Sequence, residues 1–300
     1  MTPATTEPFE VVHPDTSTIE RPEWLALRKP GTGSSDAAPA MEMSPWVSQY
    51  AQWAEKSNLI PEQAQSPMFA WRLALEPVIL DHAEREGWTT GPMRRHLMVR
   101  SIEHPWMLAN PDGLTATEVV EAKTAAAWDE KRWDEGVPDH YVVQAVHLMI
   151  VTGRRRCVMP VMFGCDPPRL FVIDFDPPLA GQIVAQTGEF WRRVVENDPP
   201  DPDGSEASML ALRAVYLESV EGKSVDLPES FREPLALRRA HALIAKEHTD
   251  SCDAVKASVM KAMGDAEAAK LEAVTVATWK TSKSGSRRFL WTEPKGEGEQ

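Results

Sequence analysis

The sequence is poor in the features that mark disulfide-rich, metal-finger and membrane proteins. Its three cysteines, Cys157, Cys165 and Cys252, form no C-x-x-C pair, so we expect neither a disulfide framework nor a zinc or iron-sulfur site. No run approaches the ~20 consecutive apolar residues that cross a bilayer. The opening stretch MTPATTEPFEVVHPD lacks the basic start and apolar run of a secretory signal. We therefore expect a cytoplasmic protein with no membrane contact.

Positive charge is also scarce. The chain has 32 Lys and Arg against 45 Asp and Glu, a net charge of -13, which argues against coating nucleic acid by bulk attraction and leaves only local basic grooves. What is present is a length of 300 residues with 42% apolar content, enough for one large domain or two smaller ones. The sequence thus predicts a globular protein whose contacts with nucleic acid, if any, are local.

Periodicity and turn residues predict a mixed α/β (α+β) domain. The expected helices cover residues 22–28, 36 onward, 46–56, 67–86, 138–152 and 179–197. Pro77 is expected either to kink the fourth of these or to mark a second helix start, and Gly153 to end the fifth. The expected strands cover residues 96–101, 106–113, 118–124, 157–163 and 170–175.

Composition predicts four regions along the chain. Residues 1–20 are polar and contain proline, and we expect a flexible N-terminal arm there, followed by a core at 21–197. NDPPDPDGSE provides a linker at 198–205. Residues 206–300 form a helical extension, with helices at 206–221 and 229–262 and a β-hairpin that turns at Lys283–Ser286.

One strand carries an unusual pair of charges. In LTATEVVEAKT, alternation places Glu121 and Lys123 on the same face as Val119. Upstream, NPDG sets Asp112 before a glycine turn, so a hairpin would return it beside Glu121. Two carboxylates suit a hard divalent cation such as magnesium, and a nearby lysine can hold or help to deprotonate an attacking water.

Two helical polar residues are expected to face inward. Glu76 lies on the stripe of Leu73, Leu80 and Ala83, where an unpaired carboxylate would be costly. It should therefore meet a cation or a metal. Gln144 lies similarly on the stripe of Tyr141, Leu148 and Val151 in the next long helix, facing the sheet.

Together these features resemble the PD-(D/E)XK nuclease superfamily and, more narrowly, the YqaJ-type viral recombinase family to which lambda exonuclease belongs. A lone E-x-K carries little information, whereas five ordered blocks over about residues 20–195 are specific. The matching blocks are EWLALRKPGTGSSDAAPAMEMSPW, ALEPVILDHAERE, NPDGL, VEAKT and YVVQAVHLMIVTG. The resemblance implies a restriction-endonuclease-like core, a central mixed β-sheet flanked by helices, to which the helical and hairpin extension is added.

The resemblance also implies a role for individual residues. The metal ligands would be Glu76, Asp112, Glu121 and the backbone carbonyl of Ala122. Lys123 would position the water nucleophile, and Gln144 would hold Lys123 or the water. The 5'-phosphate would be bound by Arg28 and Ser35, with Tyr141 as a weaker candidate for the same neighbourhood.

The implied activity is Mg²⁺-dependent 5'-to-3' digestion of linear double-stranded DNA, leaving 3' single strands for recombination. Two ions, of magnesium or manganese, are implied, together with a homo-oligomer such as a trimeric ring and a single-strand annealing protein as partner. Two departures from the family pattern concern end recognition more than hydrolysis: Val146 replaces the second Gln of Gln-x-Gln, and Ser34 replaces a glycine.

The residues alone leave alternatives open, both for the function and for the role of the basic residues. The chain could be a non-catalytic DNA-end-binding protein, although an intact Asp112, Glu121 and Lys123 speak against it, or an endonuclease or single-strand nuclease of the same superfamily. Two basic runs, Arg94–Arg95 and Arg154–Arg156, either flank a DNA groove or are solvated. In the extension, a cluster of cations would contact the DNA backbone or dock on the acidic body: Lys280, Lys283, Arg287 and Arg288.

Overall fold

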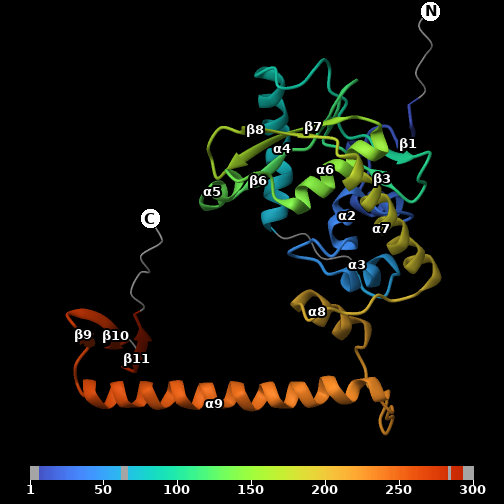
Figure 1. The fold of residues 1–300 in the computed structure, drawn as a ribbon. Coiled ribbons are helices and arrows are strands. Elements are labelled where there is room, and N and C mark those ends of the chain that lie inside the picture. Colours follow the sequence, from blue (N-terminus) through green and yellow to red (C-terminus); the bar gives the residue numbers. More distant parts are fainter. Residues whose placement is uncertain (1–6, 62–66, 283–284, 293–300) are drawn as a thin grey trace, which may run out of the picture. The chain divides into compact units, whose positions relative to one another are not determined.

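The computed structural model, which describes residues 7–61, 67–282 and 285–292, centres its first unit, Met1–Ser219, on a five-stranded mixed sheet (Figure 1). The strands are β4 (Gly113–Leu114), β5 (Val119–Val120), β6 (Lys123–Ala125), β7 (Arg156–Phe163) and β8 (Arg169–Asp174). Neighbouring strands pair antiparallel at β4–β5 and β7–β8, and parallel at β5–β7 and β6–β7. The expected mixed sheet is confirmed.

β5 and β6 lie in line along the same edge of β7 and are separated by two residues. Val119 is opposite Cys157, and Lys123 is opposite Val161, so the parallel register continues across the gap. The Glu121 N–H donates to the Val158 carbonyl at 3.0 Å, and the next rung would need the N–H of Pro160. A proline has no N–H, so β7 cannot donate to the Glu121 carbonyl and the ladder is interrupted there.

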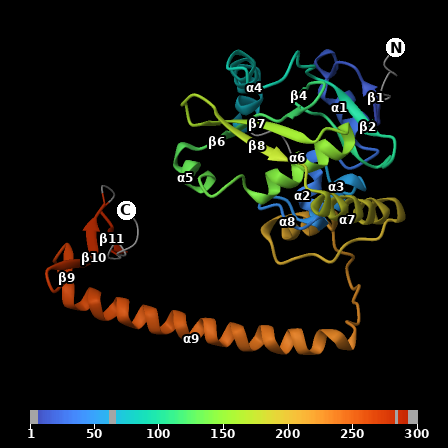
Figure 2. The ribbon, with the colours of Figure 1, turned by 45° about the horizontal axis from the view of Figure 1, so that its top comes forward.

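Helices cover both faces of this sheet (Figure 2). α6 (Asp139–Thr152) packs on the face of Val119, where it contributes much of the main hydrophobic core. α4 (Pro67–Arg85) packs on the other face, where Leu80 contacts Val120 and Val158 in a smaller cluster. The alternation expected for Val119 and Val120 is therefore confirmed, because the two valines belong to different cores.

A second sheet corrects the expected flexible arm at residues 1–20. β1 (Phe9–His13) pairs antiparallel with β2 (Met98–Ser101), which pairs with β3 (Leu108–Ala109). Phe9 is only 6% exposed and belongs to the main core. Sequence reasoning missed this strand because its five residues, FEVVH, contain only one alternation of charged and apolar side chains. Among polar neighbours, that alternation is too short to indicate a strand.

The remaining elements of the first unit follow the expected order. Gly153 ends α6 in the left-handed conformation, with φ of 69°, and Pro77 lies inside α4. The other helices are α1 (Arg21–Arg28), α2 (Ser34–Ala40), α3 (Gln49–Lys56), α5 (Glu130–Trp133), α7 (Pro177–Glu196) and α8 (Glu206–Val215), with short 3-10 turns η1 (Thr16–Thr18) and η2 (Ala127–Asp129). None of the described helices has the length and apolarity needed to span a membrane.

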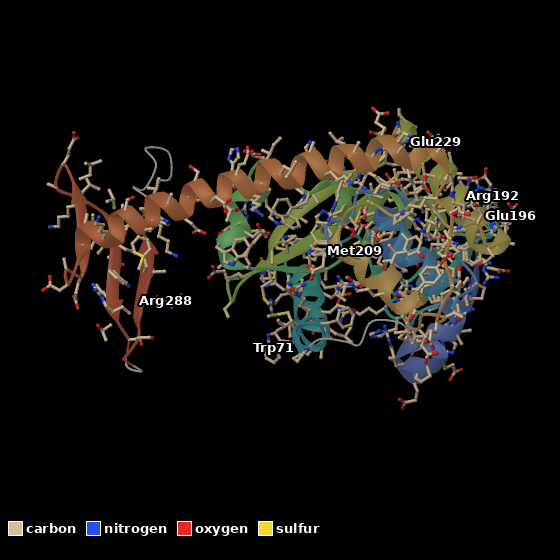
Figure 3. The ribbon with its side chains drawn as sticks, turned by 90° about the horizontal axis from the view of Figure 1, so that it is seen from below. Trp71, Arg192, Glu196, Met209, Glu229 and Arg288 are labelled. Carbon is tan, nitrogen blue, oxygen red and sulfur yellow. The ribbon has the colours of Figure 1, made fainter. Side chains whose placement is uncertain are left out.

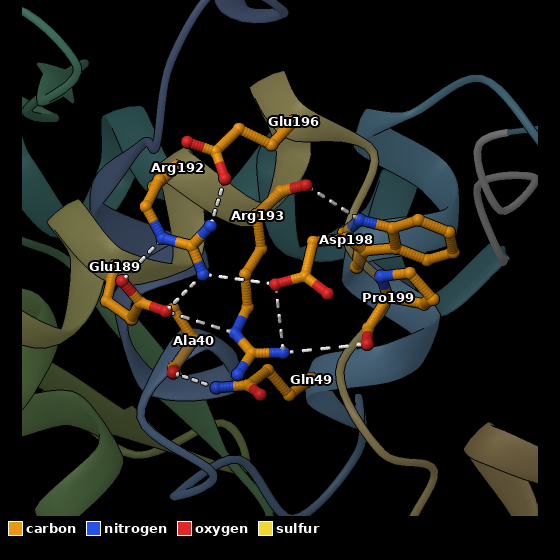
Figure 4. A network of polar contacts seen from close by, with 9 residues as sticks. Ala40, Gln49, Glu189, Arg192, Arg193, Glu196, Asp198 and Pro199 are labelled. Atoms are coloured by element: carbon orange, nitrogen blue, oxygen red, sulfur yellow. Dashed lines mark hydrogen bonds and ion pairs between the residues drawn. The ribbon is translucent and has the colours of Figure 1, made fainter.

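The end of α7 is tied to the segment that follows it (Figure 4). Arg192 donates to Glu189 and to Asp198 Oδ2 at 3.0 Å, and the Arg193 carbonyl accepts from Trp53 Nε1 at 3.3 Å. Beyond it, Ala211 of α8 packs with Trp53 in a separate apolar cluster. The predicted boundary at 198–205 is therefore corrected: α8 belongs to the first unit, which extends to Ser219.

The second unit, Val220–Gln300, consists of a long helix and a small sheet. It contains η3 (Glu229–Phe231), α9 (Arg232–Met263) and the antiparallel strands β9 (Ala268–Leu271), β10 (Val274–Thr281) and β11 (Arg287–Trp291). The expected hairpin is thus a three-stranded sheet. Its turn was expected at 283–286, of which Lys283 and Ser284 lie outside the described residues; Gly285 N donates to the Ser282 carbonyl at 3.0 Å.

Candidate active site

Glu121 is the centre of a buried polar cluster at the gap between β5 and β6. It is 4% exposed, and its Oε1 accepts hydrogen bonds from Lys123 Nζ at 2.5 Å and from Gln144 Nε2 at 2.6 Å. Glu121 and Lys123 share a face as expected, and α6 covers that face with Gln144. A buried carboxylate is stable only when it is paired and hydrogen-bonded, and these two donors meet that need.

Asp112 returns to Glu121 through the turn that joins β4 to β5. Gly113 is opposite Val120 in the antiparallel pair, so the preceding residue reaches the gap, where Asp112 Oδ2 accepts from the Ala122 N–H at 2.7 Å. Burial and the nearby carboxylates of Glu121 and Glu76 raise the pKa of Asp112 well above its usual value, against the opposing effect of Lys123.

Glu76 approaches the same acids from α4. Burial, followed by repulsion from Glu121, raises its pKa to about 6. Below it on the helix, Leu80 and Ala83 are fully buried, as expected, whereas Leu73 is 53% exposed, so the apolar stripe is shorter than the sequence indicates. Glu76 was expected to meet a cation or a metal. Lys123 and Arg95 lower its pKa through their charge, but among the described residues it forms no ion pair, so a metal at Glu76 stays a prediction.

Lys123 remains an ammonium in this setting. Burial alone would lower its pKa, but Glu121 and Asp112 outweigh burial and raise it. Its Nζ lies 5.1 Å from the ring centroid of Tyr141, which stacks on Trp133 at 5.5 Å. The structure therefore places Tyr141 beside Lys123. It also connects Gln144 to Glu121, whereas the sequence indicated Lys123 or a water as its partner.

The cluster offers carboxylate oxygens, which are the kind of ligand that a hard divalent cation binds. The carboxylates come from separate parts of the chain, and the charge of Glu121 contributes to the raised pKa values of Glu76 and Asp112, which is the electrostatic condition that a bound cation relieves. Their oxygens are not preassembled: among the described residues, no group of three or more His, Cys, Asp or Glu side chains is arranged to hold a metal. Asp112 Oδ2 is taken by Ala122 N–H, and Glu121 Oε1 by its two donors.

A second polar cluster brings Arg28 to Ser35. Arg28 Nη2 donates to Ser35 Oγ at 2.5 Å and forms a short ion pair with Asp36. Arg28 and Ser35, which were both expected to bind the 5'-phosphate, therefore lie side by side, and phosphate binding itself stays a prediction. Gly31 permits the turn, because a Cβ there would come within 2.6 Å of the Trp106 carbonyl oxygen.

Two buried residues of this cluster were missed by sequence reasoning. Lys56 Nζ, on α3, pairs with Asp36 Oδ2 at 2.7 Å and donates to the Gly31 carbonyl at 2.9 Å. Burial would raise the pKa of Asp36, but Arg28 and Lys56 lower it to about 2. Asp36 thus stays ionised between two cations. Its position directly after the Gly-Ser-Ser turn was the only available signal.

α6 lies between the two clusters. Gln144 reaches Glu121, and one turn later His147 is fully buried and its Nε2 lies 3.0 Å from the Leu108 carbonyl. Burial lowers the pKa of His147 to about 4, so it is neutral at physiological pH. α6 also packs on α2, which carries Ser35 and Asp36.

The basic runs are engaged in ion pairs within the first unit. Arg95 pairs with Asp81 and Glu84, each at 2.7 Å, and Arg154 pairs with Glu7 at 2.8 Å. Arg156 is opposite Asp174 at 3.1 Å. Arg156, whose side chain is 53% exposed, fits the solvated alternative, whereas Arg95 and Arg154 are largely buried in their ion pairs and fit neither a solvated run nor a DNA groove.

Comparisons with known proteins agree on one family. Residues 23–155 match the model of the YqaJ-like viral recombinase domain. The chain is 31% identical over 225 residues, 72% of its length and 70% of the relative, to the uncharacterised protein YqaJ of Bacillus subtilis (strain 168).

Among solved structures, it is similar to the alkaline exonuclease LHK-Exo of Laribacter hongkongensis. The complex of that enzyme with dAMP has a TM-score of 0.51 and 21% identity, covering 66% of this chain and 100% of that one. A second structure of LHK-Exo has a TM-score of 0.49, with 22% identity and the same coverage. At this identity the likeness shows the fold, and it agrees with the expected central mixed sheet.

Proposed function

The chain belongs to the YqaJ-like viral recombinase family, and on that premise we propose that it is a metal-dependent exodeoxyribonuclease that digests linear duplex DNA from the 5' end. One observation carries the proposal: the buried Glu121 carboxylate is held by Lys123 and Gln144 beside two further acids of raised pKa. The fold shared with an alkaline exonuclease supports the same reaction class.

We assign the divalent cation, Mg²⁺ or Mn²⁺, to Glu76, Asp112 and Glu121, with a backbone carbonyl at the gap as a further ligand, and two ions are part of the proposal. When bound, the cation supplies charge stabilisation at the phosphoryl group and lowers the pKa of a water. The Ala122 carbonyl is the ligand that the family resemblance implies. The Glu121 carbonyl is a second candidate, since Pro160 cannot donate to it.

The residues of the chain position the reactants. Lys123, as an ammonium, donates to the attacking water or to a phosphate oxygen and so orients in-line attack. Gln144 holds the Glu121 carboxylate in place from α6. The water attacks the phosphorus, and the leaving oxygen departs on the opposite side, so the carboxylates must not move while charge develops.

End recognition is assigned to Arg28 and Ser35. Asp36 fixes the Arg28 guanidinium, whose Nη2 lies beside Ser35 Oγ. The guanidinium can donate a charge-assisted hydrogen bond to an anion, and the Ser35 hydroxyl can donate a neutral one to the same anion. A terminal phosphate exists only at an end, and a clamp for it would give the digestion its 5'-to-3' direction. A 3' single strand would remain as product, for an annealing protein to bind. A homo-oligomeric ring, which would make digestion processive, is also part of the proposal.

The test uses full-length protein with linear duplex that carries a 5'-phosphate, with and without Mg²⁺. We expect mononucleotides in the presence of the ion and none in EDTA, and no products from Glu121→Gln under either condition. Binding without cleavage would support a non-catalytic DNA-end binder in place of an enzyme. Cutting of closed circles would support an endonuclease.

A further inference from the structure

We propose that the small sheet of the second unit is a docking surface for the phosphate backbone of DNA. The surface, which we call the basic face, consists of Lys270, Lys280 and Arg288. The choice of DNA as the polyanion rests on the proposed function, but the surface lies outside the active-site residues and its binding does not require hydrolysis.

The register of the small sheet puts its cations on one side. Lys280 is directly opposite Arg288, and Thr278 is opposite Leu290 and Ala268. Lys270 lies two residues beyond Ala268 in β9 and therefore shares this side. The three cations are exposed, among them Arg288 (Figure 3), and Leu290 between them is 49% exposed. This side of the sheet is open to solvent.

The opposite side is covered within the second unit. Ala277 there is fully buried, and Lys256 of α9 lies 5.6 Å from the ring centroid of Phe289. Arg287 anchors the sheet by donating to the Gly264 and Ala266 carbonyls at 2.6 Å, and it stacks over Trp279 at 3.7 Å. Arg287 is thus committed to the fold, and the basic face is presented on a fixed support.

The charge arrangement of the basic face is unfavourable on its own. Like charges directly opposite in an antiparallel pair destabilise it, and Lys280 and Arg288 are such a pair. Within the described part of the chain, Lys270, Lys280 and Arg288 make no ion pair with an acid. Residues 273–292 contain no Asp or Glu, in a sequence with 45 acids. An external anion would relieve this repulsion.

A polyphosphate backbone suits this surface better than a single anion. The cations are spread over three strands about 4.8 Å apart, so they would meet successive charges of an extended partner. They would contact phosphates and carry no sequence information. We therefore infer that the second unit adds affinity for DNA that is salt-dependent and independent of sequence.

The test measures DNA binding by the full-length protein in EDTA, where no hydrolysis occurs, over a series of KCl concentrations. The variant replaces all three cations of the basic face, Lys270→Gln, Lys280→Gln and Arg288→Gln. On duplex DNA we expect the slope of log K against log salt to become shallower by about 2.7, and on single-stranded DNA by about 2.1. A change on only one of the two substrates would identify that substrate as the ligand.

The matched control replaces three exposed cations of α9, Arg238→Gln, Arg239→Gln and Lys246→Gln, which removes the same total charge from the same unit. It should keep the wild-type slope. The inference fails if the basic-face variant keeps the wild-type slope on both substrates or if the control loses as much. If the triple variant does not fold by circular dichroism, Lys280→Gln and Arg288→Gln are measured singly, each with an expected change of about 0.9 on duplex.

A separate assay distinguishes this inference from the nuclease proposal. With Mg²⁺ and saturating duplex, the basic-face variant should turn over at the wild-type rate, whereas Glu121→Gln should lose turnover and keep the wild-type slope. If the wild-type protein does not cleave DNA but the slopes change as expected, the docking surface stands and the nuclease proposal fails.

Discussion

Lys123 Nζ and Gln144 Nε2 donate to the same atom, Oε1 of Glu121, at 2.5 and 2.6 Å. The two donors come from different elements: Lys123 begins β6, and Gln144 lies in the middle of α6. Oε1 is therefore held by the sheet and by the helix at once, which leaves Oε2 as the Glu121 oxygen that has no part in these two bonds.

Lys123→Ala should lower kcat about 10²- to 10³-fold and leave the affinity for DNA nearly unchanged. Of the two donors, Lys123 and Gln144, only the Lys123 ammonium has a positive charge with which to stabilise the reacting phosphate. Single-turnover digestion and DNA binding in EDTA measure the two quantities. Lys131→Ala, which removes an exposed lysine of α5, is the control. Digestion at the wild-type rate by Lys123→Ala would refute its role.

Gln144→Ala should lower kcat about 10- to 100-fold, since Glu121 would lose the donor that fixes its orientation. Because Lys123 and Gln144 share one acceptor atom, their effects should not add: a double-mutant cycle with Lys123→Ala should give a coupling of at least about 0.5 kcal/mol. Gln182→Ala, on the exposed side of α7, should have no effect. Strict additivity would show that the two donors act independently.

Mg²⁺ should raise the melting temperature of the wild-type protein in the absence of DNA. A cation among Glu76, Asp112 and Glu121 would relieve their repulsion, and a concentration of 100 times Kd would stabilise the fold by about 2.7 kcal/mol. Glu121→Gln should reduce the shift, and EDTA should abolish it. An equal shift in Glu121→Gln, measured by calorimetry, would place the ion elsewhere.

Asp36→Asn should impair recognition of the 5'-phosphate and destabilise the fold. It would leave Lys56 and Arg28 without their shared carboxylate, and breaking such a buried pair costs about 3 to 5 kcal/mol. In digestions below the melting temperature, KM should rise for duplex with a 5'-phosphate more than for duplex with a 5'-hydroxyl, with kcat maintained. Glu189→Gln, which loosens the exposed network at α7, is the matched control. An equal rise in KM for both ends would leave Asp36 with a structural role only.

His147 should make the fold sensitive to mild acid. Its folded pKa of about 4 lies below the ordinary 6.5, so the unfolded chain takes up the proton first and stability falls as the pH drops from 6.5 to 4. The full loss is about 3 kcal/mol. Urea denaturation across this range measures it, and His147→Gln should flatten the dependence. His248→Gln, on exposed α9, should leave it unchanged; persistence of the loss in His147→Gln would assign it to other groups.

Local patterns predicted the supports of the active site well. The faces of Val119 and Val120, the turn at Asp112 and the end of α6 at Gly153 follow from alternation and turn chemistry, which depend on neighbouring residues. Lys56 and His147 could not be found in this way. Their partners, Asp36 and the Leu108 carbonyl, are 20 and 39 positions away, and a lysine or histidine on a helix is usually exposed.

Pairing over long distances accounts for the other differences. β1 forms because Phe9–His13 meets β2 nearly ninety residues later, and α8 joins the first unit because Ala211 meets Trp53. Neither contact leaves a periodic signal in its own segment. In β9, four residues, AAKL, become a strand only through their pairing with β10.

Pro160 leaves one backbone acceptor of the active site without a donor from the central sheet. A proline is normally kept out of a central strand, yet in β7 it removes the rung to the Glu121 carbonyl, while the Glu121 N–H keeps its bond to the Val158 carbonyl and the rungs at Val120 and Lys123 remain. β7 therefore anchors the peptide of Glu121 through its N–H alone. A ligand can take up the Glu121 carbonyl without breaking a backbone hydrogen bond to β7, so the scaffold stays intact when the site is filled.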